Sequence, residues 1–183
     1  MRPPVEYRPE FLTSDEADEL LEHMMLEPWR QETVRVYGRE HKVPRLQLWY
    51  GDQQYAYSGS TLQPRPFPPF LRDIVVRLGG PWPGCEVNSC LANLYRDGSD
   101  KVAWHADDEP ELGPDPVISC ISLGATRTFQ VKPKNGGPRT DYELTHGSMV
   151  TMTHGCQLGW VHQIPARKRV TEPRASLTFR TLS

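Results

Sequence analysis

The chain has little that would place it in a membrane. None of its apolar runs approaches the roughly 18–20 residues that a bilayer-spanning helix requires. The N-terminal stretch MRPPVEYRPEF carries prolines and charges where a signal peptide would have an apolar segment. We therefore expect no membrane contact and a location in the cytoplasm, or in the nucleus if the source is eukaryotic.

Cysteine and net charge are also sparse. The four cysteines, Cys85, Cys90, Cys120 and Cys156, form no C-x-x-C pair, which argues against a zinc knuckle or a dithiol redox motif. Without a signal peptide, we expect a reducing compartment and thiols that are buried or partly buried. The net charge of −2 over 183 residues leaves the question of a polyanionic partner open.

Two segments have the pattern of amphipathic helices. Residues Thr13 to Glu16 form a capping box, and apolar residues follow at helical spacing until Pro28 ends the pattern. A second apolar stripe runs from about residue 69 to residue 78 and is followed by Gly79-Gly80, a helix stop signal. We expect a helix over each segment, with one face packed on the rest of the protein.

Most of the remaining chain consists of short apolar or alternating runs separated by Gly, Pro, Asn and Asp. These runs predict strands at residues 45–50, 86–95, 117–123, 128–131, 148–153, 160–164 and 175–181. Helices followed by many short strands favour a mainly β (α+β) fold, an antiparallel sandwich or jelly roll with flanking helices. The length favours a single domain spanning residues 1–183.

The last predicted strand has two chemically different faces. Its apolar residues alternate with a polar set: Arg174, Ser176, Thr178 and Arg180. The polar face should point into the interior of a barrel, where two uncompensated guanidinium groups would be costly. The sequence therefore predicts a bound anion at this strand, and a dicarboxylate suits two guanidinium forks.

Three further residues have the composition of a metal site. His105-Ala106-Asp107 would place an imidazole and a carboxylate on one face of a strand, although an isolated match of this kind is more often a hydrogen-bonded pair. His162 lies in a later, apolar-flanked strand. Two histidines and one carboxylate on a β scaffold are the ligand set of non-haem Fe(II) oxygenases, whose open positions bind a 2-oxo acid and O₂. Asn93 and Tyr95 share a strand face and can hydrogen-bond either a carboxylate or the neighbouring backbone.

Eight sequence blocks, from about residue 34 to residue 180, resemble the AlkB family of Fe(II)/2-oxoglutarate-dependent nucleic-acid dealkylases, above all its duplex-DNA-repair members. The blocks are VYG (36–38), VPRLQLWYGD (43–52), YAYSG (55–59), NLYRDGSDKVAWHADDE (93–109), SLGATRTFQ (122–130), HGSMVTM (146–152), WVHQIPARK (160–168) and PRASLTFR (173–180). The resemblance implies a double-stranded β-helix (jelly-roll) core at 85–183. An N-terminal helical extension at 1–33 and a nucleotide-recognition lid at 34–66 would precede this core.

The resemblance also implies roles for individual residues. His105, Asp107 and His162 would bind Fe(II), and Asn93, Tyr95, Arg174, Thr178 and Arg180 would bind 2-oxoglutarate. Val36, Tyr37, Gly38 and Arg39 would form a wedge that enters the duplex, Tyr55 and Tyr57 would line the base pocket, and Asp108 and Glu109 would read the base edge. Arg167, Lys168, Arg169, Lys132 and Lys134 would contact the phosphate backbone.

The implied function is oxidative repair of N-alkylated bases, including 1-methyladenine, 3-methylcytosine and etheno adducts, in single- or double-stranded DNA. The base would be flipped out of the stack, its alkyl carbon hydroxylated by an Fe(IV)-oxo species, and formaldehyde released. The cofactors would be Fe(II), 2-oxoglutarate and O₂, with ascorbate as an aid, and the protein would act as a monomer. The alternatives are the same oxygenase chemistry on RNA or protein, and a nucleic-acid-binding module without catalysis.

Some positions depart from the family pattern. Ser176 stands where the family often has Asn, and Tyr37 stands where duplex-repair members have Phe. The loop at 132–141 is also shorter. A group of basic residues near the wedge fits a solvated surface and a nucleic-acid contact about equally: Arg30, Arg35, Arg39, Lys42 and Arg45.

Overall fold

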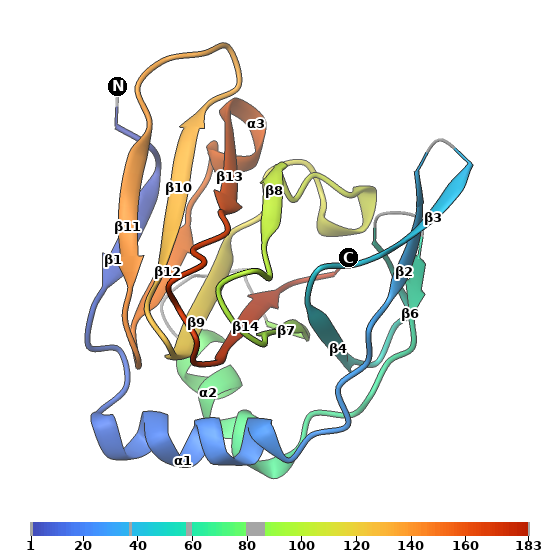
Figure 1. The fold of residues 1–183 in the computed structure, drawn as a ribbon, viewed down its shortest axis with the longest axis vertical. Coiled ribbons are helices and arrows are strands. Elements are labelled where there is room, and N and C mark those ends of the chain that lie inside the picture. The colour runs from blue at the N-terminus through green and yellow to red at the C-terminus, as the bar shows by residue number, and fades with distance from the viewer. Residues whose placement is uncertain (1, 37, 58–59, 80–86, 183) are drawn as a thin grey trace.

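The computed structural model describes residues 2–36, 38–57, 60–79 and 87–182. It contains two larger antiparallel sheets, and two helices lie along one side of the six-stranded sheet (Figure 1). This arrangement confirms the mainly β jelly-roll fold with flanking helices that the sequence predicts.

The two edge strands of the six-stranded sheet pair with strands that are distant from them in the sequence. Its order is β1 (Val5–Arg8), β12 (Met149–Met152), β9 (Ile118–Gly124), β14 (Arg174–Arg180), β7 (Ser89–Tyr95) and β4 (Leu46–Gly51). The strand β4 therefore belongs to this sheet, although it falls within the segment 34–66 assigned to a lid. The central strand, β14, pairs with β7 and β9 over nearly its whole length.

The second sheet has four strands, and two hairpins lie outside both sheets. The four-stranded order is β11 (Thr140–Leu144), β10 (Arg127–Pro133), β13 (Trp160–Ile164) and β8 (Val102–His105). The hairpins are β2 (Thr33–Val36) with β3 (Arg39–Lys42), and β5 (Tyr55–Tyr57) with β6 (Ser60–Leu62). Two short helical elements, η1 (Pro110–Leu112) and α3 (Cys156–Gly159), lie in the connections that follow β8 and β12.

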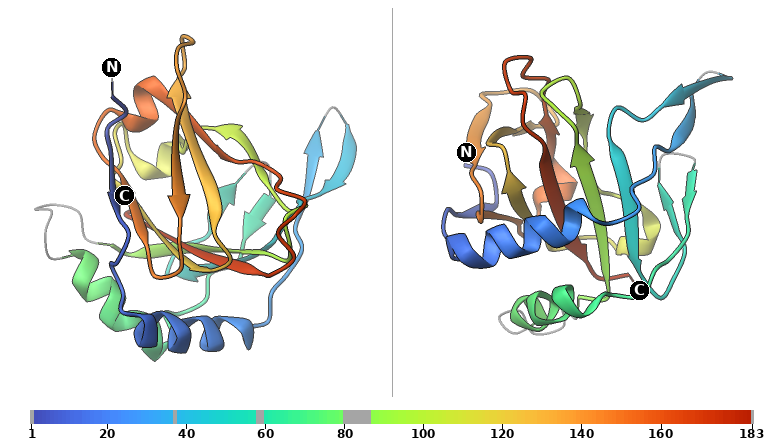
Figure 2. Two further views of the ribbon diagram at one scale, coloured as in Figure 1. Left: turned by 60° about the vertical axis from the view of Figure 1, so that its left-hand side comes forward. Right: turned by 60° about the horizontal axis from the view of Figure 1, so that its bottom comes forward.

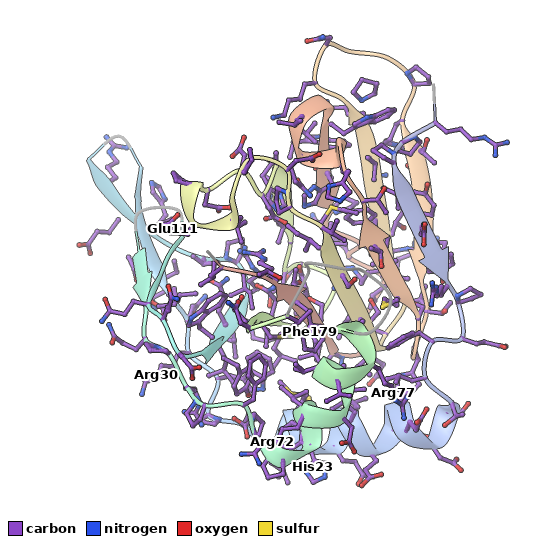
Figure 3. All side chains as sticks on the ribbon, turned by 180° about the vertical axis from the view of Figure 1, so that it is seen from behind. His23, Arg30, Arg72, Arg77, Glu111 and Phe179 are labelled. Carbon is purple, nitrogen blue, oxygen red and sulfur yellow. The ribbon has the colours of Figure 1, made fainter. Side chains whose placement is uncertain are left out.

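The helix α1 (Ser14–Met25) begins at the predicted capping box. The Glu16 amide donates to Thr13 Oγ1, and the Thr13 amide donates to the Glu16 carboxylate. The buried face of α1 packs with α2 (Pro69–Gly79) in one apolar cluster under the six-stranded sheet. Arg77 of α2 also donates to the Glu16 carboxylate and so links the two helices, and Figure 3 labels Arg77 at this end of the molecule.

The alternation of β14 separates the protein core from the cavity. Ala175, Leu177 and Phe179 belong to the cluster beneath α1 and α2, and Figure 3 shows Phe179 beside α2. Burial of a side chain of this size contributes about 1.5–3 kcal/mol. The polar residues of the same strand line a cavity on the other side. The predicted two-faced strand is therefore confirmed in its geometry.

Several strands differ from the sequence prediction. Of the predicted strand at 86–95, residue 86 lies outside the described residues, and β7 begins at Ser89. The strands β1, β2, β3, β5, β6 and β11 were not predicted; β3, for example, is exposed at every position and so shows no alternation. Cys90 and Cys156 are buried and Cys120 is partly buried, as expected, whereas Cys85 lies outside the described residues.

Two loops at one end of the sheets are joined directly. The Gly98 amide donates to the Val170 carbonyl at 2.7 Å, and the Arg167 amide donates to the Gly98 carbonyl at 2.6 Å. A Cβ atom at Gly98 would lie 1.9 Å from the Arg167 carbonyl oxygen, so only glycine permits this approach. The buried Arg127 guanidinium donates to carbonyls of both loops, at Asp97 and Asp100 on one side and Pro165 on the other.

Within the described part of the chain, no helix is long and apolar enough to cross a membrane.

Candidate metal centre and anion cavity

A β-bulge in β8 orients the first candidate metal ligand. His105 lies opposite His162 of β13, whereas Val102 lies opposite Ile164, so three residue steps on β8 match two on β13. Such a bulge shifts the alternation of a strand, and it lets Val102 and His105 both line the cavity. The strand β8 ends at His105, so the expectation that Asp107 shares its strand is wrong, and Asp107 lies in the irregular segment that follows.

The structure nevertheless brings the three candidate ligands together. Their ligand atoms, one each from His105, Asp107 and His162, all lie within 4.8 Å of one another. The two carboxylate oxygens of Asp107 lie 3.7 Å from the Nε2 atoms of His105 and His162 respectively. These distances are too long for direct hydrogen bonds. The buried Asp107 Oδ2 has no hydrogen-bond partner among the described residues, as expected of an oxygen that is available to a cation.

Both histidines direct their Nε2 atoms toward Asp107. His105 Nδ1 lies 2.8 Å from the Ala103 carbonyl oxygen, which can only accept, so Nδ1 carries a proton, and Nε2 is the ring nitrogen that faces Asp107. Burial lowers the pKa of His162 to about 3, and the neighbouring His105 acts in the same direction. The imidazole of His162 is therefore neutral at physiological pH.

An arginine from β14 keeps the third ligand ionised. Burial alone would raise the pKa of the Asp107 carboxyl, but nearby positive charge, above all that of Arg180, outweighs it and holds the pKa below its ordinary value. The Arg180 guanidinium donates to Asp107 Oδ1 at 3.2 Å. Two imidazoles and one carboxylate fit an Fe(II) ion, because imidazole and carboxylate both suit this metal.

The remainder of the cavity is cationic. Arg174, Ser176, Thr178 and Arg180 line it from β14, and Asn93 and Tyr95 line it from β7. Arg174 donates to Ser122 Oγ and lies over the Tyr95 ring, yet its buried Nη1 has no hydrogen-bond partner among the described residues. A buried donor of this kind is costly unless it meets an acceptor. The donor set therefore fits a bound carboxylate.

Two residues of the β4 segment, which were not assigned to the site, hold Asn93. Arg45 Nε donates to Asn93 Oδ1 at 2.7 Å, and Gln47 Nε2 donates to the same oxygen at 3.1 Å. These bonds fix the orientation of the amide. Arg45 is only 5% exposed and lines the cavity, so its assignment to a surface basic group is wrong. The signal was present, because Arg45 and Gln47 are two residues apart and therefore share a strand face.

The predicted substrate residues lie on the two hairpins and in the segment that follows β8. Val36 ends β2 and Arg39 begins β3, with Gly38 between them at a φ of 77°. Tyr37 lies outside the described residues, and Tyr55 and Tyr57 lie on β5. The Asp108 carboxylate is 66% exposed and lies 3.5 Å from Lys134 Nζ. Glu109 is partly buried.

The residues that are predicted to contact phosphate make different contacts within the protein. Lys132 Nζ lies 4.3 Å from the centre of the Trp104 ring. Arg167 forms a 2.8 Å ion pair with Glu143. Lys168 and Arg169 are exposed beside it. The structure therefore places Arg167, Lys168 and Arg169 in one loop, and Lys132 and Lys134 on a different part of the surface.

Comparison with known proteins shows the family. Residues 4–180 match the 2OG-Fe(II) oxygenase superfamily. The chain is 40% identical over 185 residues to human "Alpha-ketoglutarate-dependent dioxygenase alkB homolog 3", covering 95% of this chain and 64% of that protein. It is 39% identical over 159 residues to human "DNA oxidative demethylase ALKBH2", covering 81% of this chain and 60% of that protein. The chain thus spans less than two thirds of the length of either relative.

Solved structures with low sequence identity share the fold. "The structure of OsALKBH1" superposes with a TM-score of 0.66 at 19% identity, covering 99% of both chains. An oxidoreductase of the 2OG-Fe(II) oxygenase family from Burkholderia pseudomallei gives a TM-score of 0.66 at 17% identity, covering 97% of this chain and 84% of that one. With a matching family, fold and metal-binding geometry, this chain belongs to the 2OG-Fe(II) oxygenase superfamily, alongside its AlkB-homologue members.

Proposed function

We propose that this chain is an Fe(II)- and 2-oxoglutarate-dependent dioxygenase that removes N-alkyl groups from DNA bases. The observation that carries the proposal is the cavity itself, because a His-Asp-His cluster and a set of buried arginine donors line the same space. The resemblance to a relative named a DNA oxidative demethylase supports DNA as the substrate.

His105, Asp107 and His162 would hold the iron. The imidazole of His162 is neutral and the carboxylate of Asp107 is ionised, the forms in which both groups bind a metal. When bound with 2-oxoglutarate and O₂, the iron supplies the oxidant that hydroxylates an alkyl carbon. Arg180 would keep Asp107 oriented, because its guanidinium bonds the carboxylate oxygen on the side of His105.

The cationic end of the cavity would bind 2-oxoglutarate. Arg174 offers a buried donor without a partner, and Asn93 presents an amide whose oxygen is already occupied by Arg45 and Gln47. The Asn93 NH₂ group is then the part of the amide that can donate to a carboxylate. Tyr95 and Thr178 line the same space and add hydroxyl donors. These residues would orient the cosubstrate and exclude water from one side of it.

The alkylated base would reach the metal cluster from the side of Tyr55, Tyr57, Asp108 and Glu109. A base must leave the duplex before its alkyl group can reach a buried centre. The aromatic residues Tyr55 and Tyr57 would stack on it, and the carboxylates of Asp108 and Glu109 would favour cationic bases such as 1-methyladenine and 3-methylcytosine. The ion pair of Asp108 with Lys134 is no obstacle, because exposed pairs contribute only about 0–1 kcal/mol.

The exposed basic residues and the wedge would hold the nucleic acid. Arg167, Lys168 and Arg169 would contact the phosphates near one loop, and Lys132 and Lys134 would contact those near another. The wedge Val36, Tyr37, Gly38 and Arg39 would fill the space that the flipped base leaves. The proposal also includes etheno adducts among the substrates. The protein would act as a monomer, on single- or double-stranded DNA.

The test is a turnover assay with the full chain, reconstituted with Fe(II) under anaerobic conditions. Formaldehyde and succinate are measured after O₂ addition, with 1-methyladenine or 3-methylcytosine placed in duplex DNA, single-stranded DNA and RNA of one sequence. We expect formaldehyde from DNA and none from a matched Asp107→Asn protein.

Each other result has a defined meaning. Turnover on RNA alone would replace DNA by RNA as the substrate. Succinate without formaldehyde on any nucleic acid would keep the oxygenase and reject the substrate class, in favour of a protein or another target. Iron binding without succinate would favour a binding module and overturn the proposal.

A further inference from the structure

The main chain at Asp107 is held by a side chain instead of by a β-sheet. The strand β8 ends at His105, and residues 106–109 have no regular secondary structure. The Asp107 amide donates to Gln157 Oε1 at 2.9 Å, and this bond is buried. A metal ligand beyond the end of a strand has no strand ladder to fix it, so this bond is a direct constraint on its position.

Gln157 comes from the element that leads to another candidate ligand. It lies in the four-residue helix α3, which is followed directly by β13 with His162. Its residue exposure is 1%, and its Nε2 donates to Met152 Sδ at 3.3 Å. A backbone N–H can only donate, so the amide oxygen of Gln157 must face Asp107 and the amide nitrogen must face Met152. Both ends of the amide are therefore specified.

We infer that Gln157 is a positioning residue for the metal centre: it couples the loop that carries Asp107 to the segment that carries His162. The inference rests on the proposed function. Groups that orient metal ligands are worth about 10–100-fold in metal affinity when they are removed. Among the described residues, Gln157 is not part of the cavity lining, and its bond to the Asp107 amide is its link to the metal cluster.

The test compares substitutions at two buried glutamines, Gln157 and Gln130, which have different hydrogen-bond partners. Gln157→Leu removes the acceptor, and Gln157→Glu retains an acceptor oxygen at the same place. Gln130→Leu is the matched control, because Gln130 is also buried, at 7% exposure, and within the described residues its amide bonds the side chains of Gln163 and Asp141. The dissociation constant of Mn(II) is measured with the metal-free full chain by the electron paramagnetic resonance signal of the free ion.

We expect Gln157→Leu to weaken Mn(II) binding about 10–100-fold, and both Gln157→Glu and Gln130→Leu to remain close to the wild type. Thermal unfolding of the metal-free proteins is measured in parallel, because a purely structural role would lower the midpoint without a selective loss of metal affinity. If Gln157→Leu does not fold, Gln157→Met gives the same comparison with an unbranched side chain.

Two results would overturn the inference. One is a folded Gln157→Leu or Gln157→Met protein that binds Mn(II) like the wild type. The other is an equal loss of affinity in Gln157→Glu or in Gln130→Leu. A wild-type chain that binds no Mn(II) and no Fe(II) would instead contradict the proposed function, so the two failures are distinguishable.

Discussion

The cavity between the sheets and the β2–β3 hairpin are built under opposite constraints. In the cavity, Arg45, Arg174 and Arg180 are each at most 5% exposed, and each has a hydrogen-bonded side-chain partner. In the hairpin, every residue of β3 is exposed, and Figure 2 shows both strands extending away from the sheets. A change in the cavity therefore leaves a buried charge or donor without its partner, whereas a change in the hairpin alters only what the surface can bind.

The difference indicates a division of work. Strands from distant parts of the sequence fix the cavity, because β14 is paired on both sides. The hairpin is held by local pairing between β2 and β3. Under the proposed function, the cavity would determine whether oxidation occurs, and the exposed elements would determine which nucleic acid is oxidised.

The largest effect should come from the metal cluster. We expect His162→Ala to abolish formaldehyde formation on every substrate, because the cluster loses one of its three ligands. The control is His154→Ala, which removes an exposed imidazole whose Nδ1 lies near Asp115. Turnover retained by His162→Ala would break the assignment of the cluster as the iron site.

A substitution at the anion-binding end of the cavity should change the KM for only one substrate, 2-oxoglutarate. We expect Arg174→Met to weaken 2-oxoglutarate binding by about 2–5 kcal/mol, the usual effect of removing one partner of a buried charged contact. The KM for 2-oxoglutarate should rise while the KM for nucleic acid stays nearly constant, and steady-state kinetics measure both. Arg139→Met is the control, because Arg139 is exposed and pairs with Asp141. A rise in both KM values would remove the distinction between the two regions.

The hairpin should show a smaller and substrate-dependent effect. We expect Tyr37→Ala to reduce turnover on duplex DNA more than on single-stranded DNA, by roughly the 1–3 kcal/mol of one aromatic–base stacking contact. The same two substrates, assayed with wild type and variant, give the ratio directly. Equal losses on both substrates would reject the wedge assignment.

A change outside both regions should affect only stability. The Arg77 side chain and the Thr13 amide hold the pKa of Glu16 at about 2, below the ordinary 4.5. A carboxyl with a lowered pKa stabilises the fold above about pH 4.5, and the contribution disappears as the pH falls toward about 2. We expect Glu16→Gln to lower the unfolding temperature at neutral pH, with a difference from wild type that shrinks below about pH 4.5. A difference that does not depend on pH would assign the effect to something other than the charge of Glu16.

The sequence predicts those features that are local or strictly periodic. The capping box of α1 and the two faces of β14 are examples, because each follows from residue spacing within one element. Features that depend on a partner strand could not be predicted. The bulge that turns His105 inward exists only in the register between β8 and β13. The burial of Arg45 and the bond from Asp107 to Gln157 depend on contacts across 48 and 50 residues of sequence.

The junction at Gly98 has a consequence for proteolysis. The loop with Arg167, Lys168 and Arg169 offers three consecutive trypsin sites, and all three side chains are exposed. Its main chain, however, is bonded to Gly98 at residues 167 and 170, and the Val170 amide closes a turn onto the Arg167 carbonyl. A protease needs an extended segment in its own active site, so this loop should be cleaved only after the contact with Gly98 has opened. This basic loop would then resist trypsin although it offers three exposed sites.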